Sequence, residues 1–170
     1  SGCTLYSNVT LAGETGSVIK PSNSVPLQLF SGVGLSNVSV QNLTFEGTGA
    51  TSTNTQRFVQ IGAGSTYVSI ENCHFKKARE IALVLEGCQY VNVQGCTFMN
   101  SVVYGAEIRG ASSDVTISNC VFGNNGDSGA ATSNFGRGLV LWNTSNVVVS
   151  NCVIHDNSEY GLRLYSAASD

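Results

Sequence analysis

Apolar and polar residues alternate along short segments of this chain, and the segments repeat. In YVSIENCHF, residues 67–75, the second, fourth, seventh and ninth positions are apolar. Alternation with a period of two is typical of a strand with one buried face. The phase shifts by one position at Asn72, a residue type that tolerates a left-handed backbone, so we expect a bend there.

The nine-residue pattern occurs five times. Copies begin at residues 37, 67, 90, 114 and 146, so the spacing is close to 23 residues once polar insertions at 47–56 and 123–136 are set aside. The seventh and ninth positions of the copies predict two inward columns. The ninth is Phe45, Phe75, Phe98, Phe122 and then Ile154.

A second alternating segment belongs to each unit. Such a unit cannot bury its apolar face alone, whereas stacked units can, with every strand pairing in parallel with its equivalent one coil along. The inward pairs of this second segment are Val59/Ile61, Leu83/Leu85, Ala106/Ile108, Leu139/Leu141 and Leu162/Leu164.

These units predict an all-β fold, a right-handed, single-stranded parallel β-helix with five to six coils. We expect one domain over residues 1–170, with a first coil in 1–36 and five repeat coils in 37–170. Both ends fall inside patterned segments, which indicates part of a longer polypeptide. The main alternative is an up-and-down sandwich, which does not explain why one residue type recurs at one position of each unit.

Composition narrows the function classes. Hydrophobic residues make up 42% of the 170, enough for a substantial core, while charged residues make up 11%, well below the roughly 25% of globular proteins. The net charge of −3 and the scattered basic residues argue against nucleic acid as a partner. No apolar run of about 18 residues is present, so no membrane insertion is expected. No cofactor or metal is expected.

Cysteine occupies the seventh place in four of the five copies. Adjacent coils lie about 4.8 Å apart, more than the ~3.8 Å between Cβ atoms that a disulfide prefers, and a line of thiols is not a tetrahedral zinc site. Leu43 fills the same place in the first copy. We therefore expect a packing column of free thiols and folding in a reducing compartment. The column is Cys73, Cys96, Cys120 and Cys152.

Function is expected on the outward positions of the second segment. This face mixes carboxylates, guanidinium groups and large rings. Rings stack on the apolar faces of pyranoses, and charged groups bind hydroxyls or acidic substituents. The pattern therefore predicts a polysaccharide ligand, with Arg109, Trp142, Arg163 and Tyr165 as substrate-binding residues. The two outward columns read Gln60, Val84, Glu107, Val140, Arg163 and Gly62, Glu86, Arg109, Trp142, Tyr165.

Glu86 and Glu107 are the candidate catalytic residues. They lie one coil and two residues apart, roughly 8 Å between Cα atoms at ~3.3 Å per residue. Side-chain freedom allows the ~6.5–9.5 Å between carboxyl groups that an inverting glycosidase needs. The alternative is a cross-strand pair of Glu86 with Arg109, with Trp142 and Tyr165 covered by a loop or a neighbouring subunit.

Two longer stretches, SNVTLAGETGSVIKP and NVVVSNCVIHDNSEYGLRLYS, are similar to the coils of the pectate-lyase-like superfamily. That group includes pectinolytic enzymes, alginate-active enzymes and bacteriophage tailspikes. The resemblance covers nearly the whole chain and is specific for the fold, not for an activity. The signature motifs of polygalacturonases, alginate epimerases and calcium-dependent pectate lyases are missing, so none of those activities is carried over.

Three functional hypotheses follow. The first is a tailspike-like β-helix that binds or hydrolyses a bacterial surface polysaccharide, folds in a reducing cytosol and acts on the virion or outside the cell. A homotrimer along the helix axis would then cover Val84 and Val140. The second is a bacterial polysaccharide hydrolase or lyase, and the third is a non-catalytic structural or adhesin β-helix.

Overall fold

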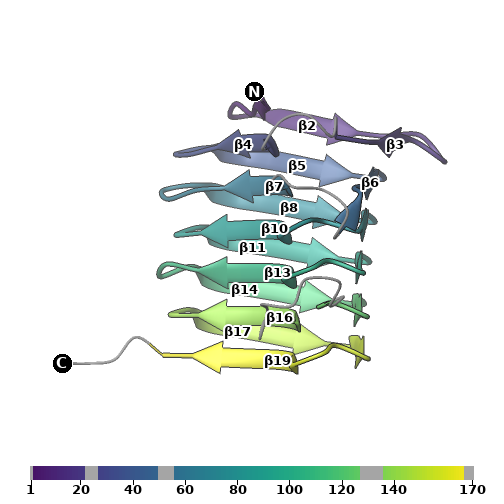
Figure 1. The fold of residues 1–170 in the computed structure, drawn as a ribbon. Coiled ribbons are helices and arrows are strands. Elements are labelled where there is room, and N and C mark those ends of the chain that lie inside the picture. Colours follow the sequence, from purple (N-terminus) through teal and green to yellow (C-terminus); the bar gives the residue numbers. More distant parts are fainter. Residues whose placement is uncertain (1, 22–26, 50–55, 127–135, 167–170) are drawn as a thin grey trace.

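The computed structural model describes residues 2–21, 27–49, 56–126 and 136–166 of the chain. In these ranges the strands stack along one axis from the N-terminal to the C-terminal end (Figure 1). All described strand pairings are parallel, for example Val91 with Val68 and with Val115. The predicted parallel β-helix is confirmed. Most of the two predicted insertions, residues 50–55 and 127–135, lies outside the described residues.

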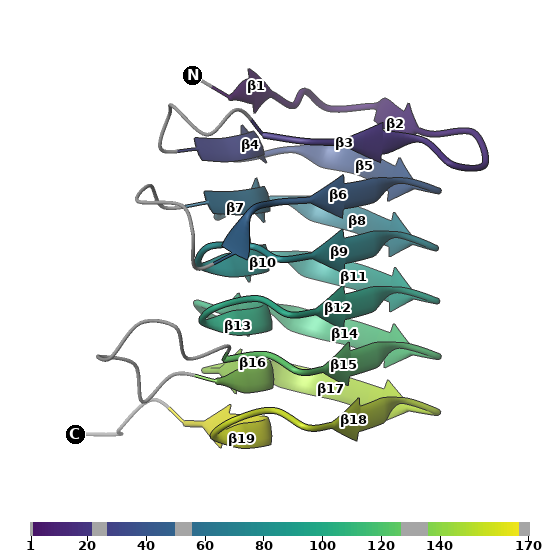
Figure 2. The ribbon, with the colours of Figure 1, turned by 45° about the vertical axis from the view of Figure 1, so that its right-hand side comes forward.

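Each complete coil contributes one strand to each of three sheets (Figure 2). Sheet A contains β1 (Cys3–Thr4), β4 (Leu27–Gly32), β7 (Gln56–Ile61), β10 (Ile81–Glu86), β13 (Tyr104–Arg109), β16 (Arg137–Trp142) and β19 (Tyr160–Tyr165). Sheet B contains β2 (Val9–Ala12), β5 (Ser36–Gln41), β8 (Thr66–Glu71), β11 (Gln89–Gln94), β14 (Ser113–Ser118) and β17 (Ser145–Ser150). Sheet C contains β3 (Val18–Ile19), β6 (Thr44–Glu46), β9 (His74–Lys76), β12 (Thr97–Met99), β15 (Val121–Gly123) and β18 (Val153–His155). Among the described residues, no helix is long and apolar enough to span a membrane.

The bend between sheets B and C occurs where the sequence predicts it. The corner residues have positive φ, which asparagine and glycine adopt more easily than other residues. Because of this bend, the apolar positions on both sides of the corner point into the same core. The five corner residues, with φ between 51° and 63°, are Asn42, Asn72, Gly95, Asn119 and Asn151.

Columns of like residues fill the core. The rings of Phe75 and Phe98 are 4.9 Å apart between centroids and nearly parallel, as are those of Phe98 and Phe122 at 4.8 Å. The cysteines stack beside them as free thiols, and each Sγ contacts backbone carbonyl oxygens: Cys96, for example, contacts Ile70 at 3.4 Å and Gln94 at 3.3 Å. The predicted packing column is therefore present.

The last coil departs from the predicted burial. Leu162 and Leu164 align with Leu139 and Leu141, which are buried, yet they are 40% and 68% exposed. They are exposed because β19 is the outermost strand of sheet A, and not because their side chains point away from the core.

The phenylalanine column should dominate stability. Phe98→Ala removes a fully buried ring stacked on both sides, and we expect it to lower the free energy of unfolding by about 3–5 kcal/mol. Tyr90→Ala is the control, because Tyr90 also stacks, at 5.0 Å on Tyr67, but is 51% exposed. It should cost less than about 1 kcal/mol in urea denaturation. Equal losses would contradict the assignment of the phenylalanines as the main core.

Candidate functional site

The outer surface of sheet A has a third column that the alternation does not predict. Arg57 donates a hydrogen bond to Gln60 Oε1 at 3.1 Å, whereas Phe58 stacks on Phe45 in the core at 5.9 Å. The strand β7 therefore bends near its start, and its second residue, Arg57, shares a face with its fifth, Gln60. We call the following residues the sheet A face. Its columns are Gln28, Arg57, Ile81, Tyr104, Arg137, Tyr160; Ser31, Gln60, Val84, Glu107, Val140, Arg163; and Val33, Gly62, Glu86, Arg109, Trp142, Tyr165.

One guanidinium group holds both candidate catalytic carboxylates. Arg109 Nη2 donates to Glu86 Oε2 at 2.9 Å, and Arg109 Nη1 donates to Glu107 Oε2 at 3.0 Å. The register places Arg109 directly beside Glu86, and Glu107 beside Val84, as predicted. The cross-strand ion pair, considered above as the alternative to catalysis, is therefore formed in this structure.

The two carboxylates differ in exposure. The Glu107 side chain is 4% exposed and the Glu86 side chain 40% exposed. Burial raises the pKa of Glu107, because the lost solvation outweighs the attraction of Arg109 and Arg57. Glu86 is thus the carboxylate that a ligand on the surface can reach, and Glu107 is a buried acid behind it.

A second ionic cluster lies towards the C-terminal end of the sheet A face. Arg137, with 7% of its side chain exposed, donates to Glu159 Oε2 at 2.8 Å and to the hydroxyl of Tyr104 at 2.6 Å. Arg163 donates to the other oxygen of Glu159 at 3.0 Å. Three of these residues, Tyr104, Arg137 and Glu159, lie outside the columns that the sequence singles out.

Aromatic rings surround the arginines of this cluster. The Arg163 guanidinium lies 4.7 Å from the centroid of the Tyr160 ring and 4.3 Å from that of Tyr165. The Trp142 and Tyr165 rings are 5.4 Å apart and tilted by 37°. Trp142 is 48% exposed, so the described chain does not cover it. Three predicted binding residues, Trp142, Arg163 and Tyr165, are thereby brought together, and Arg109 is the cross-strand neighbour of Trp142.

Val84 and Val140 are buried, contrary to the expectation that they are exposed on a single chain. They are 0% and 1% exposed in the single chain, so they do not need a neighbouring subunit to cover them. Each valine has a short side chain that lies between two longer ones on its own strand. Val84 lies between Ile81 and Glu86 on β10, and Val140 lies between Arg137 and Trp142 on β16. The prediction that trimerisation covers these two residues is wrong.

Metal-ligating groups do not cluster in the part of the chain that the structure describes. There, no three side chains of His, Cys, Asp or Glu form a group that could hold a metal ion. The sheet A face carries carboxylates, guanidinium groups, hydroxyls and rings.

The raised pKa of Glu107 predicts a pH dependence of stability. Because the folded-state pKa exceeds the ordinary value of 4.5, the folded protein binds more protons, and the free energy of unfolding falls as pH rises through the interval above 4.5. Glu107→Gln removes this contribution, so its stability relative to the unmodified protein should increase with pH, by at most ~1.4 kcal/mol per pH unit. Denaturation at several pH values measures this.

Arg109→Met provides the companion measurement. It removes the largest charge that opposes the effect of burial on Glu107, so the fall in stability with pH should become steeper than in the unmodified protein. Parallel curves for the unmodified protein and Glu107→Gln would show that Glu107 titrates equally in the folded and unfolded states.

Solved structures with a similar fold include three carbohydrate-related proteins. A candidate glycosyl hydrolase from Parabacteroides merdae has a TM-score of 0.70 and 18% identity, over 89% of this chain and 74% of its own. The catalytic domain of a GH87 α-1,3-glucanase, in complex with tetrasaccharides, has a TM-score of 0.60 and 14% identity, over 89% and 32%. The A-module of the mannuronan C-5 epimerase AlgE4 from Azotobacter vinelandii has a TM-score of 0.60 and 17% identity, over 96% and 60%.

At these identities the likeness concerns the fold. The chain spans about a third of the glucanase domain and three fifths of the epimerase module. No curated protein matches the sequence. The right-handed coil that the sequence predicts agrees with the family whose model matches residues 1–170, which is described as "Right handed beta helix region". The chain therefore belongs to the right-handed β-helix family.

Proposed function

We propose that the sheet A face binds a polysaccharide, and that its ligand is a glycan of a bacterial surface. The observation that carries the proposal is the pair of rings, Trp142 and Tyr165, which lie 5.4 Å apart beside the ion pairs of this face. Trp142 is 48% exposed, although burying such a ring is normally favourable. A pyranose has the apolar face needed to cover it.

The groups around the rings suit hydroxyl-rich ligands. Arg109 and Arg163 flank the ring pair, with 28% and 29% of their side chains exposed, and each is already oriented by a glutamate. Glu86, two coils from Trp142 in the same column, adds an exposed acceptor. Charged groups held in place by ion pairs lose little side-chain entropy when they bind a sugar.

The structural neighbours support a carbohydrate ligand. The Parabacteroides merdae protein is described as a candidate glycosyl hydrolase, the glucanase domain was solved with tetrasaccharides, and the epimerase acts on mannuronan. The proposal for this chain rests on its own residues, and the neighbours show that a β-helix of this shape is used by carbohydrate-related proteins.

The tailspike-like role is part of the same proposal. It is supported by the buried free thiols at Cys73, Cys96 and Cys120, which suit a protein made in a reducing cytosol. A virion or extracellular location and a homotrimer are the corresponding predictions. The trimer no longer draws support from Val84 and Val140, which are buried within one chain.

Hydrolysis is the second candidate function. Burial raises the pKa of Glu107 and so favours the protonated form that a general acid needs, while the exposed Glu86 could accept a proton from the attacking water. The glycosidic oxygen would then have to approach Glu107, whose side chain is 4% exposed and hydrogen-bonded to Arg109. Binding is therefore the function that the geometry supports best.

Trp142→Ala tests the binding surface. We expect at least a tenfold loss of affinity for a capsular or O-antigen polysaccharide identified on a glycan array, equivalent to about 1.4 kcal/mol. Tyr90→Ala is the matched control, because Tyr67 and Tyr90 form an exposed ring pair on sheet B, at 5.0 Å. It should leave the affinity unchanged. If the two variants bind alike, the sheet A face is not the binding surface.

Glu86→Gln and Glu107→Gln separate binding from hydrolysis. If oligosaccharides are released from the bound polysaccharide, both variants should lose at least about a hundredfold in rate, since each removes an acid–base group. The readout is the reducing ends formed per hour, alongside the affinity of each variant. Release at the full rate by both variants would rule out this pair of carboxylates as catalytic.

A further inference from the structure

A pocket on the sheet A face lies beside β4 and β7, away from the ring pair. Its volume is about 380 Å³, and it extends along the side of the β-helix over three coils. The apolar side chains of Leu5, Val33 and Leu35 line it together with two amides, those of Gln28 and Gln60. The pocket therefore combines an apolar wall with one pair of amide groups.

The orientation of both amides is fixed by a chain of hydrogen bonds that starts at Glu80. Arg57 donates to the two carboxylate oxygens of Glu80, at 2.8 and 2.6 Å, and to Gln60 Oε1 at 3.1 Å. Because a guanidinium group can only donate, the oxygen of the Gln60 amide must face Arg57. Gln28 Nε2 donates to the same oxygen at 2.7 Å. The groups of the two amides that remain for a ligand are the acceptor Gln28 Oε1 and the donor Gln60 Nε2.

Val33 forms the apolar wall beside these amides. It is 73% exposed, and Gly62 is its neighbour one coil along in the same column. A Cβ atom at residue 62 would collide with Val33 Cγ1, so the glycine allows the valine to lie along the face. An apolar wall next to a few oriented polar groups is typical of a small-ligand site.

We propose that this pocket binds the acetamido group of an N-acetylhexosamine residue. An acetamido group has one N–H donor, one carbonyl acceptor and one methyl group. Its partners in the pocket are Gln28 Oε1 for the N–H, Gln60 Nε2 for the carbonyl oxygen and Val33 for the methyl group. A pair of sugar hydroxyls would match the amides but leave the apolar wall uncovered. Because the amides are already oriented, they lose little side-chain entropy on binding.

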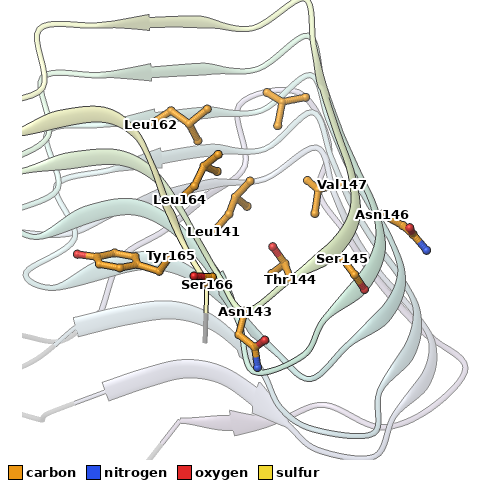
Figure 3. Close-up of a pocket in the computed structure, with 11 residues that line it drawn as sticks. Leu141, Asn143, Thr144, Ser145, Asn146, Val147, Leu162, Leu164, Tyr165 and Ser166 are labelled. Atoms are coloured by element: carbon orange, nitrogen blue, oxygen red, sulfur yellow. The ribbon is translucent and has the colours of Figure 1, made fainter. Parts of the chain in front are cut away.

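This inference rests on the proposed function, because the N-acetylhexosamine belongs to the same polysaccharide that covers the rings of Trp142 and Tyr165. Gly62 and Trp142 lie in one column, three coils or about 14 Å apart. Figure 3 shows Tyr165 pointing away from Leu162 and Leu164 and out of the β-helix. The rings and the pocket thus open on the same face, and a glycan lying along the β-helix axis reaches both.

Sugars that differ in one group test the pocket. The methyl β-glycosides of N-acetylglucosamine and N-acetylgalactosamine are titrated into the nitrogen-labelled protein, followed by proton–nitrogen correlation spectra. At least one of them should shift the side-chain amide resonance of Gln60 and the backbone amide resonance of Gly62. Methyl β-glucoside, which has a hydroxyl in place of the acetamido group, should bind at least about tenfold more weakly, because the pocket groups then stay unpaired.

Two leucine variants remove one partner of the acetamido group each. Gln28→Leu and Gln60→Leu should each lower the affinity for the N-acetyl glycoside at least about tenfold. Gln94→Leu is the matched control, because Gln94 is an exposed glutamine on β11 of sheet B, and it should leave the affinity unchanged. Thermal melts establish that each variant is folded. If Gln60→Leu does not fold, Gln28→Leu, at an exposed position, decides alone.

Equal binding of the glucoside and the N-acetyl glycosides, or unchanged binding in the leucine variants, would overturn the inference. Trp142 is the one tryptophan of the chain, so its indole resonance reports on the ring pair separately. If a polysaccharide shifts that resonance while Gln60 and Gly62 respond to no N-acetyl glycoside, the proposed function stands and the acetamido subsite fails. If Gln60 and Gly62 respond but no polysaccharide binds, the subsite stands and the proposed function fails.

Discussion

Each coil of this protein packs against neighbouring coils that repeat its pattern of apolar and polar residues. Parallel strands pair in one register, and a slip of one residue would turn the apolar side chains out of the core. The repeat distance is visible in the phenylalanine column, where ring centroids lie 4.8–4.9 Å apart. Each core position therefore needs a side chain that packs against another of its kind at that distance. Aromatic rings and small thiols do so, which explains both columns beside the sheet B–sheet C corner.

The same repeat distance constrains the outer surface. Like charges in neighbouring coils would repel at this spacing, and the sheet A face instead pairs opposite charges between coils: Arg57 with Glu80, Arg109 with Glu86, and Arg137 with Glu159. These pairs neutralise most of the charge that the face carries. The exposed Trp142 takes part in none of these ion pairs, and the proposed ligand site depends on its ring.

The nonapeptide could be read from sequence because its phase shift is marked by asparagine or glycine in every copy. The start of each sheet A strand carries no such mark. Phe58 lies in the core and Arg57 outside it, so simple alternation assigns both residues to the wrong face of the strand. The one sequence signal of this bend is the apolar Phe58 at a position that alternation places on the outer face. The burial of Glu107 depends on the lengths of side chains around it in three dimensions. No local pattern contains that information, so the carboxylate pair could be located from sequence while its accessibility could not.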